Sequence, residues 1–185
     1  MDGTTTVAGV ARILIIAGGA RGCALAADLV AQGHAVRITT RSASGRAAIE
    51  AVGAECWIGT PDRIATLRYA LESTTLACWL LGNACGRPEA VASLHGSRLE
   101  FFIGQTIDTT VRGLIYEAAG SVVPQTLAAG RALISEKAGY NAIPLRVLDA
   151  DPRDADGWGA QARAAVSELL SPDQERLTAP GTRPG

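Results

Sequence analysis

The most constraining feature of the sequence is a short apolar run that ends in a glycine-rich turn. Residues 12–17 are Arg-Ile-Leu-Ile-Ile-Ala, and the turn Ala17-Gly18-Gly19-Ala20-Arg21-Gly22 begins at the last of them. A continuous apolar run of this length, bounded by glycine, is typical of a strand that is buried on both faces. Residues 21–32 then carry leucine and alanine at helical spacing and stop at Gly33, so we expect a helix there. The chain therefore opens with a strand–turn–helix unit.

The rest of the sequence repeats this alternation of strands and helices. Thr60 and Pro61 are suited to the start of a helix, as N-cap and first-turn residues. Residues 107–120 stay ambiguous, because their apolar spacing fits a helix face but Gly113 interrupts it. We expect further strands at 35–40, 55–58, 76–81, 98–103 and 144–148, and further helices at 44–52, 60–71, 88–94, 124–138 and 158–170. This order predicts a Rossmann-like α/β fold, a doubly wound parallel sheet in a three-layer α/β/α arrangement.

Length and composition favour one domain. The chain has 185 residues, 48% of them hydrophobic, which is enough for a single core. We expect residues 11–171 to form one dinucleotide-binding domain. Residues 1–10 are small and polar and predict a flexible N-terminus. Residues 172–185 are rich in proline, glycine and threonine and predict a disordered tail.

Charge and cysteine usage exclude several classes of function. The formal net charge is -1, so we expect no nucleic-acid or membrane partner. Arg12, Arg21 and Asp28 interrupt the apolar stretch 7–31, which is too broken for a membrane span or a secretory signal. The four cysteines form no C-x-x-C pair and have no histidine at ligand spacing, which predicts no metal site and buried, reduced thiols in the cytoplasm.

An acidic cluster near the C-terminus has two interpretations. Asp149, Asp151, Asp154 and Asp156 surround Pro152. They could bind a metal ion, but capping of the following helix and a solvated loop are the favoured interpretation.

The glycine turn is suited to a dinucleotide. In the G-x-G-x-x-G fingerprint, Ala17 takes the first glycine position, and Gly19 and Gly22 match the second and third. Gly19 would let the backbone approach a pyrophosphate, and Gly22 would let the helix pack closely on the strand. Gly18 adds freedom to the turn, and the amides of residues 20–22 open a helix whose N-terminus favours phosphate. The alternative is an ordinary strand-to-helix turn.

The end of the second expected strand favours NADP(H) over NAD(H). An NAD site usually has an Asp or Glu there, whereas this chain has Thr39-Thr40-Arg41-Ser42 and no acid before Glu50. Arg41, with Ser42 beside it, could pair with a 2′-phosphate, and Arg21 in the turn could reach the same group. The alternative for each arginine is a solvated surface side chain.

Four stretches resemble the short-chain dehydrogenase/reductase superfamily, specifically its atypical, NmrA-like or epimerase-like members. They are Gly18–Gly22, the second strand from His34 to Arg41, the segment Leu80-Leu81-Gly82-Asn83-Ala84, and the later stretch from Pro124 to Arg146. The resemblance implies a Rossmann fold with bound NAD(P). It also implies that Leu81, Gly82 and Asn83 lie beside the nicotinamide ribose.

The catalytic pair of that superfamily, Tyr-x-x-x-Lys, is absent. Lys137 is the only lysine, and the position that the motif gives to tyrosine is Leu133. Thr106, Arg112 and Tyr116 are the remaining candidates for a proton or oxyanion partner.

Two classes of function therefore stay open. The chain is either an oxidoreductase that acts on a small carbonyl substrate, or a dinucleotide-binding redox sensor or complex subunit without turnover. Pairing of exposed sheet edges would allow a homodimer in either case.

Overall fold

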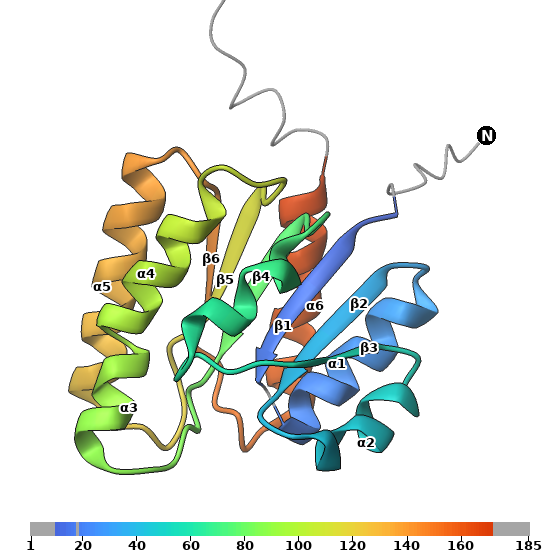
Figure 1. The fold of residues 1–185 in the computed structure, drawn as a ribbon, viewed down its shortest axis with the longest axis horizontal. Coiled ribbons are helices and arrows are strands. Elements are labelled where there is room, and N and C mark those ends of the chain that lie inside the picture. The colour runs from blue at the N-terminus through green and yellow to red at the C-terminus, as the bar shows by residue number, and fades with distance from the viewer. Residues whose placement is uncertain (1–9, 18, 172–185) are drawn as a thin grey trace, which may run out of the picture.

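The computed structural model describes residues 10–17 and 19–171 (Figure 1). Gly18, the tail at 172–185 and all of the N-terminal segment except Val10 lie outside the described residues. The predictions of a flexible N-terminus and a disordered tail therefore stay predictions.

One six-stranded sheet forms the centre of the fold. The strands are β1 (Arg12–Ala17), β2 (Ala35–Thr40), β3 (Glu55–Ile58), β4 (Leu76–Leu80), β5 (Gly113–Glu117) and β6 (Leu145–Leu148). Every neighbouring pair is parallel, and the order across the sheet is β3-β2-β1-β4-β5-β6. Ile15 of β1 is in register with Ile38 of β2 and Cys78 of β4. The predicted fold class, a doubly wound parallel sheet, is confirmed.

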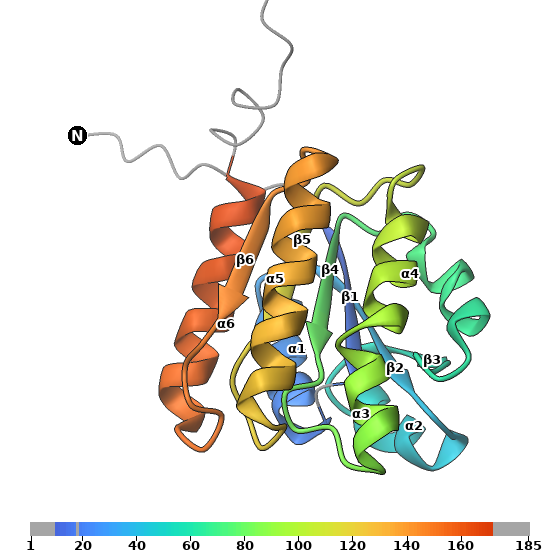
Figure 2. The ribbon, with the colours of Figure 1, turned by 90° about the vertical axis from the view of Figure 1, so that its left-hand side faces the viewer.

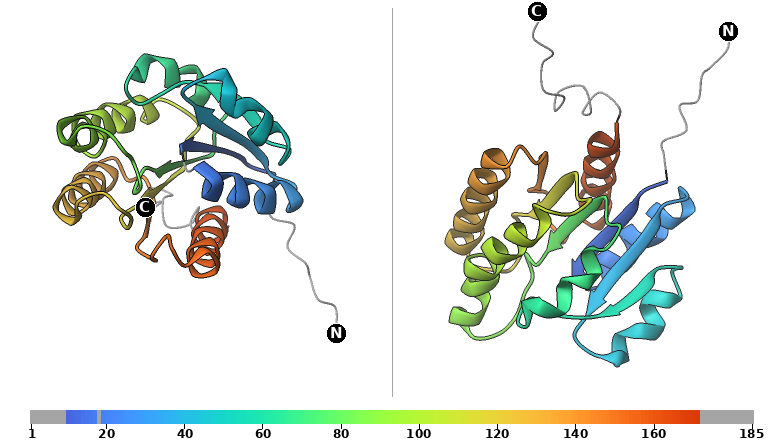
Figure 3. Two further views of the ribbon diagram at one scale, coloured as in Figure 1. Left: turned by 90° about the horizontal axis from the view of Figure 1, so that it is seen from below. Right: turned by 45° about the horizontal axis from the view of Figure 1, so that its top comes forward.

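Helices cover both faces of the sheet. The helices α1 (Gly19–Ala31), α2 (Arg46–Glu50) and α6 (Ala155–Leu170) pack on one face. The helices α3 (Pro88–Leu94), α4 (Ser97–Thr106) and α5 (Pro124–Tyr140) lie together on the other face (Figures 2 and 3). No helix within the described residues is long and apolar enough to cross a membrane.

The two faces bury two separate apolar clusters. Ile13 and Ile15 of β1 point toward α1 and α6, whereas Leu14 and Ile16 point toward α4 and α5. This alternation follows from the two-residue period of a strand. All four side chains are fully buried, which explains why β1 has a continuous apolar sequence rather than an alternating one.

The expected strand at 98–103 is wrong, because this segment lies inside the helix α4. Leu99, Phe102, Ile103 and Thr106 are buried together and follow the i, i+3, i+4, i+7 spacing of a helix face. The fifth strand is β5, which lies within the ambiguous segment 107–120. The helical interpretation of that segment therefore fails over residues 113–117.

The expected helix at 60–71 is also wrong in form. The segment instead has two short 3₁₀ helices, Ile64–Leu67 and Tyr69–Leu71. The hydroxyl of Thr66 donates to the Arg63 carbonyl at 2.6 Å and accepts from the Thr60 amide at 2.9 Å. Such side-chain bonds compete with the regular backbone bonds of an α-helix.

The cysteines are only partly buried, in contrast to the expectation. Cys78 in β4 is buried, Cys23 and Cys56 are half-buried, and Cys85 is exposed. Burial raises the pKa of the Cys78 thiol to about 12, so this thiol stays protonated and unreactive.

His95, directly after α3, is a polar residue enclosed in the core. Its Nδ1 lies 2.7 Å from the Tyr116 hydroxyl and its Nε2 lies 3.3 Å from the Leu81 carbonyl oxygen. The side chain is only 2% exposed, and burial lowers the pKa of His95 below its usual value of 6.5. Burial thus favours the neutral form of this imidazole in the native state.

We expect this burial to make stability depend on pH. Below about pH 6.5 the unfolded chain binds a proton that native His95 resists, so the free energy of unfolding falls by up to about 1.4 kcal/mol per pH unit for this residue. Urea denaturation at pH 7.5 and 5.5 measures the loss, and His95→Gln should reduce it. His34→Gln is the matched control. Burial also lowers the pKa of His34, but this side chain is less enclosed, so its substitution should reduce the loss of stability less than His95→Gln does. An equal loss in His95→Gln and in the unaltered chain would contradict the assignment.

Candidate functional site

The carboxyl ends of all six strands lie at the same end of the sheet, which we call the carboxyl edge; the left panel of Figure 3 shows it from below. The opposite end, where the strands begin, is the amino edge. After β1 the chain turns toward β2 and β3, and it then crosses back to β4 on the other side of β1. The strand order therefore reverses between β1 and β4. Open α/β sheets bind ligands at such a switch point, outside the carboxyl ends of the strands.

The glycine turn lies at this switch point and has a left-handed backbone. Ala17 has φ +64° and Gly19 has φ +52°, values that favour glycine. An added Cβ at Gly19 would meet no atom within 4 Å, so the backbone there is open to an approaching group. At Gly22 it would lie 3.0 Å from the Ala17 carbonyl oxygen and 3.4 Å from Cγ2 of Ile15. The turn thus combines an open backbone at Gly19 with close helix–strand packing at Gly22.

The end of β2 supports the turn and leaves one cation exposed. The Thr39 hydroxyl accepts a 3.1 Å hydrogen bond from the Ala17 amide. Ser42 is exposed, and its hydroxyl lies 2.7 Å from that of Ser44. Arg41 is exposed and has no hydrogen bond or ion pair to any residue in the ranges 10–17 and 19–171. The edge beside β2 therefore displays a guanidinium group with no carboxylate partner in the part of the chain that the structure describes.

A buried glutamate, which sequence reasoning did not identify, links the central elements of this edge. Glu117 ends β5 and is 0% exposed. Its Oε1 accepts hydrogen bonds from Nη2 of Arg21 at 2.8 Å and from Nε1 of Trp158 at 2.9 Å. Its Oε2 accepts from the Gly82 amide at 2.7 Å. The Arg21 guanidinium also lies over the Trp158 ring, 5.2 Å from its centroid. One carboxylate thus connects α1, α6 and the segment after β4.

This network changes the role expected for Arg21. Glu117 follows β5, on one side of β1, and Arg41 follows β2, on the other side. Arg21 reaches toward Glu117 and is only 20% exposed. The structure therefore directs Arg21 toward Glu117 rather than toward Arg41 at the end of β2.

The segments after β4 and β5 are held against each other. The Asn83 side chain accepts a 2.7 Å hydrogen bond from the Ser121 amide, and the Gly82 carbonyl accepts one from Val122 at 3.0 Å. An added Cβ at Gly82 would overlap the carbonyl oxygen of Ala119. Leu81 is buried. Of the three residues predicted beside the nicotinamide ribose, Asn83 is the exposed one.

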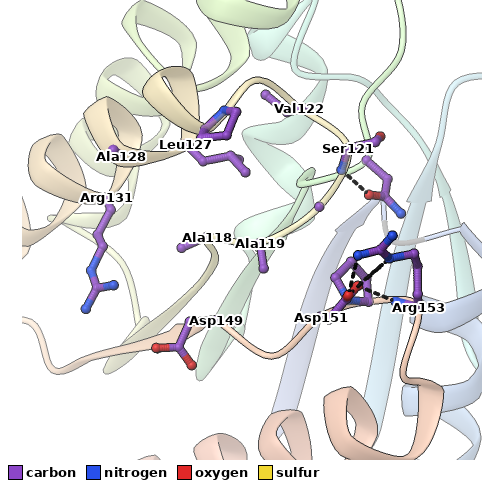
Figure 4. Close-up of a pocket in the computed structure, with 14 residues that line it drawn as sticks. Ala118, Ala119, Ser121, Val122, Leu127, Ala128, Arg131, Asp149, Asp151 and Arg153 are labelled. Atoms are coloured by element: carbon purple, nitrogen blue, oxygen red, sulfur yellow. Dashed lines mark hydrogen bonds and ion pairs between the residues drawn. The ribbon is translucent and has the colours of Figure 1, made fainter.

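A cavity of about 630 Å³ opens beside these segments (Figure 4). Its floor is the segment 118–122 after β5, one wall is the first half of α5, and the opposite wall is the loop between β6 and α6. Asn83 is the one predicted site residue that lines it.

The acidic cluster beside this cavity has the predicted capping role. Asp154 is the N-cap of α6, and its side chain accepts from the Gly157 amide at 3.1 Å. Asp151 pairs with Arg153 at 2.7 Å, and Asp149 accepts from the Gln161 amide group at 2.7 Å. These acids therefore organise the loop before α6.

The structure argues against the three catalytic candidates, because two are buried and the third lies at the amino edge of the sheet. Thr106 ends α4 and is buried, and its hydroxyl donates to the Ile103 carbonyl at 2.7 Å. Arg112 precedes β5 and lies at the amino edge of the sheet, where its amide donates to the Thr75 carbonyl. Tyr116 is fully buried under α5 against His95, and burial raises its pKa above the usual value of 10. The error follows from the misplaced fifth strand.

We expect Glu117 to be essential for stability. Glu117→Ala leaves Arg21, Trp158 and the Gly82 amide without their acceptor, and loss of one partner of a buried ion pair costs about 3–5 kcal/mol. Urea denaturation followed by tryptophan fluorescence measures the loss. Glu117→Gln, which keeps the shape and one acceptor oxygen, should lose less.

Glu72→Ala is the control for this experiment. Glu72 is exposed and has no side-chain partner among the residues that the structure describes, so its loss should change stability by less than about 0.5 kcal/mol. A cost for Glu117→Ala as small as the control's would refute the proposed importance of the network.

Comparison with known proteins finds similar folds among solved structures. No protein-family model and no curated protein match the sequence. Triphenylmethane reductase from Citrobacter sp., solved with NADP(H), matches with a TM-score of 0.55 and 14% identity over 74% of this chain and 48% of its own. UDP-glucuronic acid 4-epimerase from Bacillus cereus, solved with NAD, matches with a TM-score of 0.58 and 12% identity over 74% of this chain and 55% of its own. A short-chain dehydrogenase from Streptomyces avermitilis matches with a TM-score of 0.59 and 14% identity over 95% of this chain and 86% of its own.

The chain has the Rossmann fold of these reductases, epimerases and dehydrogenases. The Rossmann fold that the sequence resemblance implies is thus confirmed. The chain spans about half the length of several of the structures that it matches.

Proposed function

We propose that the protein binds NADP(H) at the carboxyl edge of its sheet. The pyrophosphate would lie on the amides at the start of α1, with the adenosine over β2 and the nicotinamide toward Asn83. The observation that carries this proposal is the open, left-handed backbone at Gly19, which lies at the switch point and is the first residue of a 13-residue helix. An accessible helix N-terminus in this position favours the negative charge of a phosphate.

The preference for NADP(H) over NAD(H) rests on Arg41. A guanidinium can form a bidentate pair with a phosphate, whereas a carboxylate at the same place would repel it. Arg41 is exposed at the end of β2, and the nearest acid along the following helix, Glu50, already pairs with Arg46 at 3.0 Å. Arg21 does not contribute, because it pairs with Glu117.

We further propose an oxidoreductase that acts on a small carbonyl substrate in the 630 Å³ cavity. A bound nicotinamide supplies hydride chemistry. The protein would position the substrate carbonyl and deliver or remove one proton at its oxygen. Ser121 lines the cavity and its amide is bonded to Asn83, and its hydroxyl would donate a hydrogen bond there.

A specific observation favours a second candidate, dinucleotide binding without turnover. Thr106 and Tyr116 are buried with their hydroxyls in hydrogen bonds, Arg112 lies at the amino edge, and the Glu117 carboxylate already accepts three hydrogen bonds. Loss of reduced-nicotinamide absorbance with a panel of aldehydes and ketones supports the oxidoreductase. Tight NADPH binding with no such loss supports a redox sensor or complex subunit.

We expect Arg41→Asp to remove the preference for NADPH. Calorimetric titration of the unaltered protein should show tighter binding of NADPH than of NADH. The variant loses a charged hydrogen bond worth about 1.5–3 kcal/mol, so its NADPH affinity should fall at least tenfold while its NADH affinity changes little. Arg68→Asp is the matched control, since Arg68 is also exposed but lies in the segment before β4, beside the amino edge.

Two outcomes would contradict the proposal. An unchanged ratio of NADPH to NADH affinity in Arg41→Asp would remove Arg41 from the site. Absence of binding by both nucleotides in the unaltered protein would reject the dinucleotide site itself.

A further inference from the structure

We propose that the cavity between α5 and the β6–α6 loop binds a small monocarboxylic acid, with the carboxylate on Arg131 and with Asp149 disfavouring a second anionic group. The proposal rests on the proposed function, because it names the substrate class for the same edge of the sheet. Figure 4 shows Arg131 reaching from α5, and Asp149 from the end of β6, into the space between them.

The walls of the cavity are fixed without a ligand. On one side the Ser121 and Val122 amides are bonded to Asn83 and Gly82. On the other side the Gln161 side chain accepts from the Asp149 amide at 3.0 Å and from the Ala150 amide at 2.9 Å. Segments pinned in this way need little ordering when a ligand enters, which favours binding of small molecules.

Arg131 is the one charged side chain of the cavity that has no partner within the described part of the chain. Asp151 and Arg153 pair with each other at 2.7 Å, and Asp149 accepts from Gln161. The Arg131 side chain has no hydrogen bond and no ion pair with residues 10–17 or 19–171. Its planar group of donors fits a carboxylate, which can accept two hydrogen bonds at once.

The surface beside Arg131 is apolar. Leu127 lies one helical turn before Arg131 on α5, and Ala118, Ala119 and Val122 form the floor. Their short side chains leave room for an aliphatic stem. A ligand with a charged head and a small apolar body therefore fits better than a sugar or another polyol.

On the opposite wall Arg153 neutralises Asp151, and Asp149 is the carboxylate that would limit the ligand to one anionic group. Gln161 orients the Asp149 carboxylate, and hydrogen bonds from Arg153 lower the pKa of Asp151 to about 2, so that it stays ionised. A second carboxylate on the ligand would approach this wall and be repelled. The cavity should thus prefer a monocarboxylate to a dicarboxylate of equal length.

Calorimetric titration with pentanoate and pentanedioate, in the presence and absence of saturating NADPH, tests this inference. The unaltered protein should bind pentanoate at least threefold more tightly than pentanedioate, roughly the effect of one exposed charge pair. Arg131→Gln should weaken pentanoate binding about tenfold, as for loss of a charged hydrogen bond, without changing NADPH affinity. Asp149→Asn should keep pentanoate binding and bring pentanedioate close to it. Arg68→Gln, remote from the cavity, is the control.

Each result decides one part of the inference. No pentanoate binding in the unaltered protein, or equal binding in Arg131→Gln, overturns the acid site. Equal affinities for the two acids in the unaltered protein, or an unchanged preference in Asp149→Asn, overturns the selection for one anionic group. Pentanoate binding through Arg131 without any NADPH binding would reject the proposed function and leave the acid site standing, whereas NADPH binding alone would do the reverse.

Discussion

The carboxylate of Glu117 has no contact with solvent, so protein donors must replace all the hydrogen bonds that water would give it. Three donors do so, from Arg21, Trp158 and the Gly82 amide. A buried charge held in this way is costly to form and more costly to disrupt, and its main effect is to define the positions of its partners. Here the partners are the first turn of α1, the start of α6 and the segment after β4. The whole central part of the carboxyl edge is therefore fixed relative to β5.

This network also decides where positive charge is available. Because Arg21 neutralises Glu117, it adds little attraction for an anion at the glycine turn. What remains there is the backbone, with the amides at the start of α1 and the open position at Gly19. Arg41 stands apart at the end of β2. A nucleotide at this edge would therefore be held by backbone amides at its pyrophosphate and by one side chain at a 2′-phosphate.

Some of these features were predictable from the sequence because local signals agreed. In β1 the continuous apolar run, the glycine turn and the helix that follows all indicate one unit, and the structure has it. The strand predicted at 98–103 was wrong because Arg98-Leu-Glu-Phe-Phe-Ile103 has the length and apolarity of a strand. Leu99, Phe102 and Ile103 also have helical spacing, and the structure follows that pattern. Gly113 concealed the real fifth strand, since a glycine inside a strand weakens its pattern. The reason for that glycine is packing, because an added Cβ would lie 2.8 Å from Cδ2 of Leu76.

The Glu117 network could not be predicted in the same way. Its side-chain partners are 96 and 41 residues away along the chain, so no local sequence pattern indicates these contacts. Once β5 is placed correctly, however, a single acid that closes an apolar strand at the carboxyl edge is a visible signal. The same correction moves Thr106 and Arg112 away from that edge and brings Ser121 to it.

Arg41 and Arg131 are two exposed guanidinium groups of the carboxyl edge that are independent of each other. Arg41 lies beyond β2 and Arg131 lies on α5 above β5 and β6, with the neutralised pair of Arg21 and Glu117 between them. They share no hydrogen-bond partner among the residues described, so substitutions at one should not alter the effect of the other. These two separate cationic groups, with a neutral pair between them, would suit two anionic ligands that bind side by side. The proposed phosphorylated dinucleotide at one end and the proposed small acid at the other carry charges that match this arrangement.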